Sequence, residues 1–186
     1  MTNTLRPDAV LILIDVQVGF DDPVLGTRNN PDAEANIARL VTYWARTDRP
    51  VVRVRHVSSE PGSPLGAALP GQAFKPEVAD VVPRLEIVKQ VHSAFHGTPD
   101  LHAWLSAHGA RQLVIAGIQT NRCVETTARV GSDLGYEVVV AIDATFTFDA
   151  TTPDGDKVTA DELARATAAS LHPDFGTVCR TAALLA

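Results

Sequence analysis

The sequence predicts an α/β fold, in which helices cover both faces of a parallel β-sheet. Short apolar runs that end in polar residues alternate with longer segments of helical periodicity, which is the pattern of a parallel sheet with right-handed crossovers. The first run, residues 9–14, is apolar without interruption, as in a strand buried on both faces. With 186 residues, 45% of them hydrophobic and 20% charged, the chain suits one domain over residues 1–186, built as a three-layer α/β/α sandwich.

The apolar runs and the helical patterns divide the chain into alternating elements. Strands are expected at residues 9–14, 50–54, 85–88, 113–116, 137–142 and 177–181. Helices are expected from residues 30–31, from 98–99, over 122–134 and from 159. The connection over residues 56–83 is rich in Pro, Gly and Ser, and a connection of that length is typically functional or contains short helices.

Start and stop signals accompany the helical patterns. Asn30-Pro31, Thr98-Pro99 and Thr159 are residues that favour helix N-termini, and Gly109 and Gly135 are suited to helix ends. The inward-facing residues predicted from the 3.6-residue period are Ile37, Leu40, Val41 and Trp44 in the first helix, Leu101, Trp104 and Leu105 in the second, and Cys123, Thr127, Val130 and Leu134 in the third. On the outer face of the third helix, Glu125 and Arg129 are spaced for an ion pair.

Composition narrows the class of function. The formal net charge is −6 and the Lys and Arg residues are scattered, which argues against nucleic acid or an anionic membrane surface as a partner. The N-terminal stretch MTNTLRPDAV has no signal-peptide pattern, and the longest apolar run is far too short to span a bilayer. Two cysteines do not make a disulfide framework. These features predict a cytoplasmic protein.

Three reactive side chains follow predicted strands or stand just beyond their ends. They are Asp15, Lys89 and Cys123. Each has an ordinary structural explanation: an aspartate that caps a turn, a solvated lysine, and a small core cysteine. However, the carboxyl ends of parallel strands lie on one edge of the sheet, where ligands bind. Their joint placement therefore favours a functional site.

These three groups suit nucleophilic catalysis. The thiolate is the reactive form of cysteine, and Cys123 lies in the first turn of the predicted third helix. The helix N-terminus and the Lys89 ammonium are expected to lower the pKa of the thiol, so that Cys123 would alkylate below the pH expected for a free thiol. Asp15 alone would raise that pKa, but it can accept the thiol proton. Backbone N–H groups of the turn over residues 119–123 can form an oxyanion hole.

At this point a family resemblance emerges from three ordered motifs, residues 13–20 (LIDVQVGF), 88–95 (VKQVHSAF) and 117–129 (GIQTNRCVETTAR), with Asp143-Ala144-Thr145 as a further match. The chain resembles the isochorismatase-like cysteine hydrolase superfamily over nearly its whole length. The resemblance implies a six-stranded parallel sheet in the order 3-2-1-4-5-6 and an Asp15–Lys89–Cys123 catalytic triad. It also implies a cis peptide between Ile118 and Gln119 and an oxyanion hole made by the N–H groups of Gln119 and Cys123.

The resemblance also suggests a branch. Members that hydrolyse isochorismate lack the cysteine, so Cys123 makes the chain similar to the amidase branch: nicotinamidase, N-carbamoylsarcosine amidase and ureidoacrylate amidase. This implies an amidohydrolase, a hydrolase of C–N bonds other than peptide bonds, acting on a small-molecule amide or carbamoyl substrate through a Cys123 thioester with Asp15 as base. Ester or thioester hydrolysis on the same triad, or a non-catalytic binding protein that retains the fold, are the alternatives. The family further implies a homo-oligomer, a dimer or tetramer, in which a neighbouring subunit can close the pocket.

The motif after the second strand differs from that of nicotinamidases, which have a metal site with an Asp-x-His sequence. Here the chain reads Val54-Arg55-His56, without the aspartate. We therefore expect no metal and no cofactor. His92 and His96 have the spacing of a helical zinc pair, but they precede the second helix, where a full helical turn is not assured.

Several pocket residues stay open between two interpretations. Phe20 and Phe95 either form apolar walls of the substrate pocket or are core aromatics. Gln119 either contacts substrate or only forms the turn, and His56 either bonds a polar substrate group or anchors its loop. The alternatives for Arg53, Arg55 and Arg122 are a substrate carboxylate, solvent or a subunit contact. In the implied strand order Lys89 lies two strands from Asp15, so it must reach inward to join the triad.

Overall fold

The computed structural model describes residues 5–185 and has one six-stranded parallel sheet, in the order β3-β2-β1-β4-β5-β8. This confirms the strand order 3-2-1-4-5-6. The strands are β1 (Val10–Ile14), β2 (Val51–His56), β3 (Leu85–Lys89), β4 (Gln112–Ile118), β5 (Glu137–Phe146) and β8 (Thr177–Cys179). A separate hairpin is formed by β6 (Ala150–Thr151) and β7 (Lys157–Val158). Residues 1–4 and residue 186 lie outside the described part. The expectation about the signal-peptide pattern concerned in part these first four residues.

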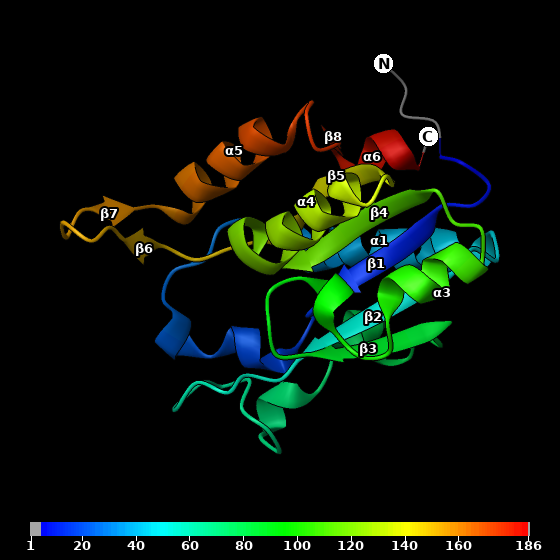
Figure 1. Ribbon diagram of the computed structural model, residues 1–186. Coiled ribbons are helices and arrows are strands. Elements are labelled where there is room, and N and C mark those ends of the chain that lie inside the picture. Colours follow the sequence, from blue (N-terminus) through cyan, green and yellow to red (C-terminus); the bar gives the residue numbers. More distant parts are fainter. Residues whose placement is uncertain (1–4, 186) are drawn as a thin grey trace.

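Helices cover both faces of the sheet (Figure 1). They are α1 (Ala33–Arg46), α2 (Pro76–Ala79), α3 (Leu101–Ala107), α4 (Glu125–Asp133), α5 (Ala160–Leu171) and α6 (Thr181–Leu184). Side chains of β1 alternate between the two faces: Leu11 and Leu13 pack in one cluster with residues of α1, α2 and α6, and Ile12 and Ile14 pack in another with residues of α3, α4 and α5. This alternation explains why β1 is apolar at every position.

Two helices begin later than predicted. Asn30 has φ 47° and its amide donates to the carbonyls of Asp143 and Thr145, at 3.0 and 2.6 Å, so it fixes the β5 end instead of capping α1. The N-cap of α3 is Asp100, whose side chain accepts from the N–H of Ala103. Thr98 is paired with β3 instead. In both cases the X-Pro signal marks a turn before the helix and not its first residue.

The predicted inward stripe of the third helix is wrong at its C-terminal half. Leu134 is 42% exposed, whereas Ala128 and Gly131 are buried. The helix follows a π-helical turn, η5 (Thr120–Val124), and ends at Asp133, so that Leu134 is its C-cap residue and lies at the exposed end of the helix. The predicted Glu125–Arg129 pair is present, with 2.7 Å between Oε1 and Nη2.

The other start signal was correct. Thr159 is the N-cap of α5 and forms a reciprocal capping box with Glu162, which satisfies two backbone N–H groups at the helix start. The long connection also contains short helices, as its length indicated: η3 (Pro70–Gln72) and α2. The strand expected at residues 137–142 is longer in the structure: β5 continues to Phe146, and the segment beyond it forms the β6–β7 hairpin.

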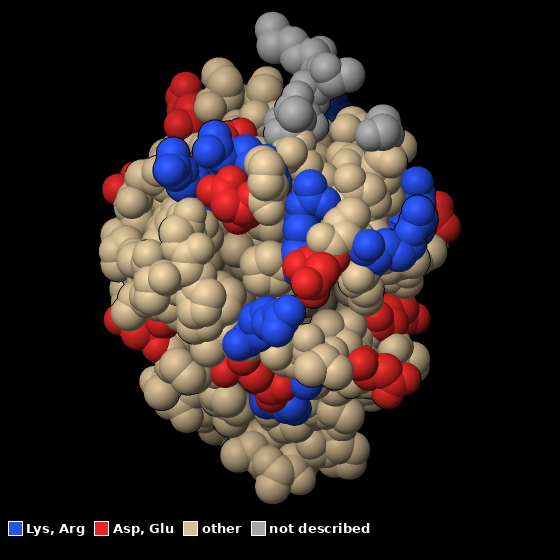
Figure 2. All heavy atoms as spheres, turned by 90° about the vertical axis from the view of Figure 1, so that its right-hand side faces the viewer, with Lys and Arg blue, Asp and Glu red and all other residues tan. Residues whose placement is uncertain are grey.

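The distribution of surface charge and the lengths of the helices bear on the partners that the sequence argued against. On the face in Figure 2, positive and negative side chains lie interspersed, with no large area of one sign. Within residues 5–185, the helices are all too short or too polar to cross a membrane.

Candidate active site

Asp15 directly follows β1 and is completely buried. Its backbone has φ 50°, a left-handed conformation that aspartate tolerates better than most residues. Beside it β4 approaches very closely: a Cβ added at Gly117, which has φ 130°, would lie 2.0 Å from the carbonyl oxygen of Ile14. Only glycine fits here. This close approach brings the end of β1 next to the turn that carries Cys123.

Lys89 reaches inward from the end of β3, as its predicted place in the site requires. It pairs in register with His56 of β2, and its side chain is fully buried. The ammonium nitrogen lies 2.6 Å from Oδ2 of Asp15. A long side chain therefore crosses the intervening strand, and two charges become a buried, hydrogen-bonded pair.

Cys123 lies in the π-helical turn η5 and is 7% exposed. Its Sγ, a carboxylate oxygen of Asp15 and a ring nitrogen of His56 lie within 4.8 Å of one another. The carboxylate oxygen of Asp15 that does not bind Lys89, Oδ1, is buried and has no hydrogen-bond partner among residues 5–185. It is therefore available to accept the proton of the Cys123 thiol. On another side, Nδ1 of His92 lies 3.7 Å from Sγ. The structure thus brings Asp15, Lys89 and Cys123 together.

The electrostatics of the thiol differ from the expectation. Burial and the Asp15 carboxylate raise the pKa of Cys123 to about 12, and the Lys89 ammonium only partly opposes them. The expected lowering was wrong because the cysteine is more deeply buried, and closer to a carboxylate, than the sequence indicated. Burial also raises the pKa of Asp15 above its ordinary value, against the effect of Lys89. The resting site therefore holds a neutral thiol beside a carboxylate that accepts protons more readily than an exposed aspartate does.

His56 is a neutral neighbour of this group. Burial, and then the charges of Lys89 and His92, lower the pKa of its imidazole to about 4. Its Nδ1 lies 3.3 Å from the Lys89 ammonium, and a neutral ring can accept a hydrogen bond there. Its backbone N–H donates to the Gln17 side chain at 2.8 Å, and its carbonyl accepts from the amides of Gln17 and Gln72. The structure thus agrees with both interpretations of His56, because its backbone is fixed by hydrogen bonds and its ring lies beside the Lys89 ammonium and lines the cavity.

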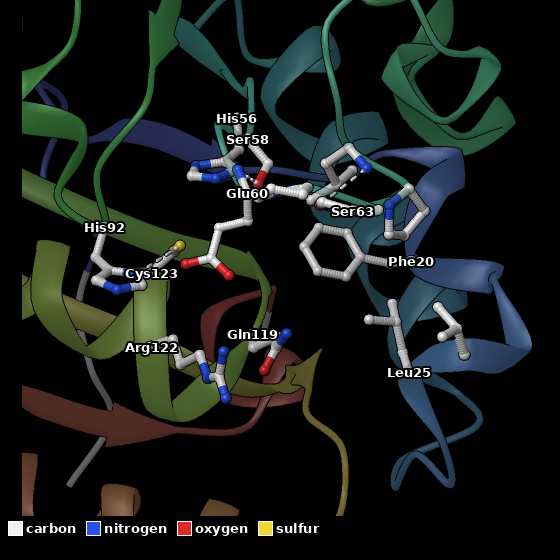
Figure 3. A pocket seen from close by; sticks show the side chains of 15 residues that line it. Phe20, Leu25, His56, Ser58, Glu60, Ser63, His92, Gln119, Arg122 and Cys123 are labelled. Atoms are coloured by element: carbon white, nitrogen blue, oxygen red, sulfur yellow. Dashed lines mark hydrogen bonds between the residues drawn. The ribbon is translucent and has the colours of Figure 1, made fainter.

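A cavity of about 360 Å³ opens above Cys123 (Figure 3). Phe20 and Leu25 form part of an apolar wall, and Glu60 and Arg122 bring one charge of each sign. The remaining lining residues are Val24, His56, Ser58, Pro61, Gly62, Ser63, Pro64, Leu65, His92 and Gln119. Much of the lining comes from residues 58 and 60–65, in the long connection that was expected to be functional or to contain short helices. A larger hollow of about 720 Å³ beside α1 and α2 contains none of the three triad residues.

The structure separates the remaining candidates. Phe20 and Gln119 line the cavity, and the peptide bond between Ile118 and Gln119 is cis. Phe95 does not line it: its ring stacks on Tyr136, 5.9 Å between centroids, and packs against the core on the α3–α4 side of the sheet. The motif that follows Lys89 turns Phe95 away from the cavity and His92 toward it.

The three arginines also differ in their surroundings. Arg53 and Arg55 both bind the carboxylate of Glu86 and lie over the Phe74 ring, so their charges are engaged within the fold. Arg122 alone of the three lines the cavity. Sequence reasoning missed Glu60 altogether, and it considered His92 only as one half of a metal pair with His96. The spacing of His92 from Lys89 was the signal that could have found it.

Three side chains of the site are of the kinds that bind metal ions. Asp15, His56 and Cys123 form the group of metal-ligand side chains found within residues 5–185. However, the Lys89 ammonium bonds Asp15 and lies against His56, so a cation would have to displace or neighbour a buried positive charge. His96 does not line the cavity with His92. The donor set therefore fits a proton-transfer site better than a metal centre.

A hydrogen-bonded frame holds the nucleophile turn. The hydroxyl of Thr120 donates to that of Thr145 at 2.9 Å, which in turn donates to the Ile142 carbonyl. The Thr147 hydroxyl donates to the side chain of Asn121. The Asp143-Ala144-Thr145 motif thus supports the turn from below and does not contact the cavity.

Comparison with known proteins is consistent with this arrangement. The model of the isochorismatase domain matches residues 9–182. A crystal structure of an isochorismatase-family protein from Chromobacterium violaceum superposes with a TM-score of 0.91 at 41% identity, covering 97% of this chain and 93% of that one. Streptothricin hydrolase of Streptomyces noursei is 31% identical over 94% of this chain and 63% of its own length. Ureidoacrylate amidohydrolase RutB of Methylorubrum extorquens is 44% identical over a shorter part, 39% of this chain and 27% of its own length.

Proposed function

The chain belongs to the isochorismatase family, whose members are hydrolases, and from that premise we propose that it is a cysteine amidohydrolase acting on a small amide or carbamoyl compound. One observation carries the proposal. The Asp15 carboxylate lies between the Lys89 ammonium and the Cys123 thiol at the base of a cavity large enough for a small molecule.

The first half of the reaction forms a thioester. Cys123 attacks the carbonyl carbon while Asp15 takes the thiol proton, because a free thiolate is scarce at neutral pH when the thiol pKa is about 12. The raised pKa of Asp15 makes it a better proton acceptor than an ordinary aspartate. Lys89 balances the negative charge that the carboxylate and the sulfur share. The N–H groups of Gln119 and Cys123 stabilise the oxyanion, and the C–N bond then breaks as the departing nitrogen takes up a proton from the cavity side.

The second half hydrolyses the thioester. Water attacks the acyl carbon and gives a proton back to the cavity side, the C–S bond breaks, and Asp15 returns the thiol proton to the sulfur as the acid leaves. In this scheme each buried group returns to its starting state, as a catalyst must. The N–H pair that served the first oxyanion serves the second as well, because the carbonyl carbon has not moved.

The cavity favours a polar substrate of modest size. Arg122 lines it without an ion-pair partner among residues 5–185, and a carboxylate on the substrate would supply one. Two of the relatives named above have names that denote hydrolysis, one of them of a ureido acid. Ureido acids and amides that carry a carboxylate are therefore the compounds to test first.

The proposal is tested by ammonia or amine release from a panel of primary amides, ureido acids and carbamoyl compounds. Wild type should release product, and Cys123→Ala should not. Intact-mass measurement during turnover should show an acyl adduct on wild type, and Cys123→Ser should show an ester adduct or none.

The second cysteine gives a matched control. Cys179 lies on β8, away from the cavity, so Cys179→Ala should keep both activity and adduct. Turnover by Cys123→Ala at the wild-type rate would refute the proposal, and so would the absence of hydrolysis of every compound by folded wild type.

A further inference from the structure

We propose that His92 is a second proton-transfer residue of this site, which protonates the departing amine and later activates the hydrolytic water. The inference rests on the proposed amide hydrolysis and adds a group that the Asp15–Lys89–Cys123 triad does not include. His92 Nδ1 lies 3.7 Å from the sulfur of Cys123, and the residue is exposed and lines the cavity. In Figure 3 its ring lies beside the sulfur, with a dashed line joining the two.

The need for such a group comes from the position of Asp15. Its carboxylate is completely buried, with one oxygen bonded to Lys89 and the other left to the thiol. Asp15 is not among the residues that line the cavity, whereas Cys123 and His92 are. A departing amine lies in the cavity, so a cavity-lining group is better placed than Asp15 to give it a proton. His92 meets the same sulfur from the cavity side.

The other histidine of the site does not fill this role. His56 has a pKa lowered to about 4, and its Nδ1 faces the Lys89 ammonium, so a proton added to that ring would meet a buried positive charge. Its backbone is also fixed on both sides by Gln17. His92 faces no such cation within hydrogen-bond distance among residues 5–185: its contact there is the sulfur. Of the two rings, His92 is the one whose nitrogen faces the reacting sulfur from the cavity and, within the described part of the chain, has no buried cation against it.

The proton balance closes with two separate carriers. In acylation the S–H proton of Cys123 moves to Asp15, the S–C bond forms, and the His92 imidazolium gives its proton to the nitrogen as the C–N bond breaks. In deacylation the neutral His92 ring takes a proton from water as the O–C bond forms. Asp15 then returns its proton to sulfur as the S–C bond breaks. The sum is amide plus water to acid plus amine, and both carriers return to their starting states.

This division of labour predicts a dependence on the leaving group. An amine must be protonated to leave, whereas p-nitrophenolate leaves without a proton. The experiment therefore compares an amide and a p-nitrophenyl ester of the same acid in wild type and His92→Asn. For the ester, the rapid release of the first equivalent of p-nitrophenol measures acylation, and the steady state that follows measures deacylation.

His92→Asn should lower amide turnover about 100-fold or more, the usual contribution of a positioned acid or base. The first equivalent of p-nitrophenol should appear within about threefold of the wild-type rate, because Cys123 and Asp15 remain. The later steady state should fall as amide turnover does. Imidazole in the medium should restore part of the amide activity of His92→Gly, a rescue that a purely structural role would not give.

The outcomes separate two failures. No burst and no amide turnover by folded wild type would refute the amidohydrolase proposal itself. Two results with an active wild type would refute the role of His92 alone. One is an equal fall, in His92→Asn, of the amide turnover rate and of the rate of the first p-nitrophenol release; the other is an unchanged amide turnover rate in that variant. His96→Asn is the matched control, because His96 is exposed, lies four residues away and does not line the cavity, so its kinetics should equal wild type. Unchanged urea midpoints establish that each variant is folded.

Discussion

Replacing Lys89 with methionine tests the central buried pair directly. Methionine keeps most of the length of the side chain and removes its charge, which leaves the Asp15 carboxylate buried without its ammonium partner. Both side chains are 0% exposed, and breaking such a pair by removing one partner typically costs about 3–5 kcal/mol. For a domain of 186 residues, each kcal/mol lowers the midpoint temperature by about 2–4 °C, so we expect a decrease of roughly 6–20 °C.

The loss should depend on pH with a defined sign. Burial already raises the pKa of Asp15 while Lys89 opposes the rise, so in Lys89→Met that pKa is higher still. A carboxyl group with a raised folded-state pKa stabilises the fold below its unfolded pKa, and that contribution is lost as pH rises through the folded value. The difference between wild type and Lys89→Met should therefore be largest in alkaline buffer and shrink as pH falls toward the ordinary range of aspartate.

The assay is urea unfolding followed by tryptophan fluorescence at several pH values. Arg84→Met is the control, because it breaks the exposed pair with Asp48, with side chains 64% and 92% exposed, for which a loss below about 1 kcal/mol is expected. Asp15→Asn/Lys89→Met should lose less than the sum of the single variants. Equal losses in Lys89→Met and Arg84→Met, or a Lys89→Met loss below about 1 kcal/mol in alkaline buffer, would contradict the reasoning.

Three further predictions concern other parts of the chain. Although burial opposes it, hydrogen bonds from Arg28 and Lys75 lower the pKa of Glu34 to about 2. After a discount for solvent screening, wild type should exceed Glu34→Gln in stability by about 1–2 kcal/mol above pH 5 and lose that margin as pH falls toward 2. Urea midpoints measured across this range check it, and a margin independent of pH would argue against it. Iodoacetamide should label Cys123 slowly near neutral pH, because the raised pKa of about 12 leaves little thiolate. Mass spectrometry of the labelled protein, with Cys123→Ala as background, measures the rate. Fast labelling at pH 7 would contradict the prediction. Gly117→Ala should cost at least about 2 kcal/mol and abolish activity, because its Cβ would lie 2.0 Å from a backbone oxygen; a variant with the wild-type urea midpoint would show that the two strands can move apart.

The backbone of this fold was largely readable from the sequence. The uninterrupted apolar run before Asp15 predicted a strand covered on both faces, and β1 is buried at every position. The capping box at Thr159 depends on residues three apart, and such local signals survive folding unchanged. The family resemblance added the sheet order, which local patterns do not contain.

Properties set by several distant segments were harder to predict. The sign of the Cys123 pKa shift depends on how deeply the thiol is buried and on its distance from Asp15, and neither follows from helix position. The facing of Leu134 was wrong because α4 ends at Asp133, which leaves Leu134 as the C-cap at the exposed end of the helix. Phe95 and His92 stand three apart, and only the path of the chain after Lys89 decides which of them meets the cavity. The oligomeric state and the cytoplasmic location stay predictions.

The two glutamine amides that fasten the rim have a consequence for how such a protein changes over generations. The side-chain amides of Gln17 and Gln72 both donate hydrogen bonds to the His56 carbonyl. Residues 58–65 follow this fixed point and supply much of the cavity lining. The proposed reaction uses side chains at the buried ends of β1 and β3 and in the turn after β4, whereas residues 58–65 of the cavity lining lie in a loop outside these elements. Replacing residues 58–65 with a loop of equal length, while Gln17 and Gln72 are kept, should therefore change which compounds bind and leave the cleavage reaction unchanged.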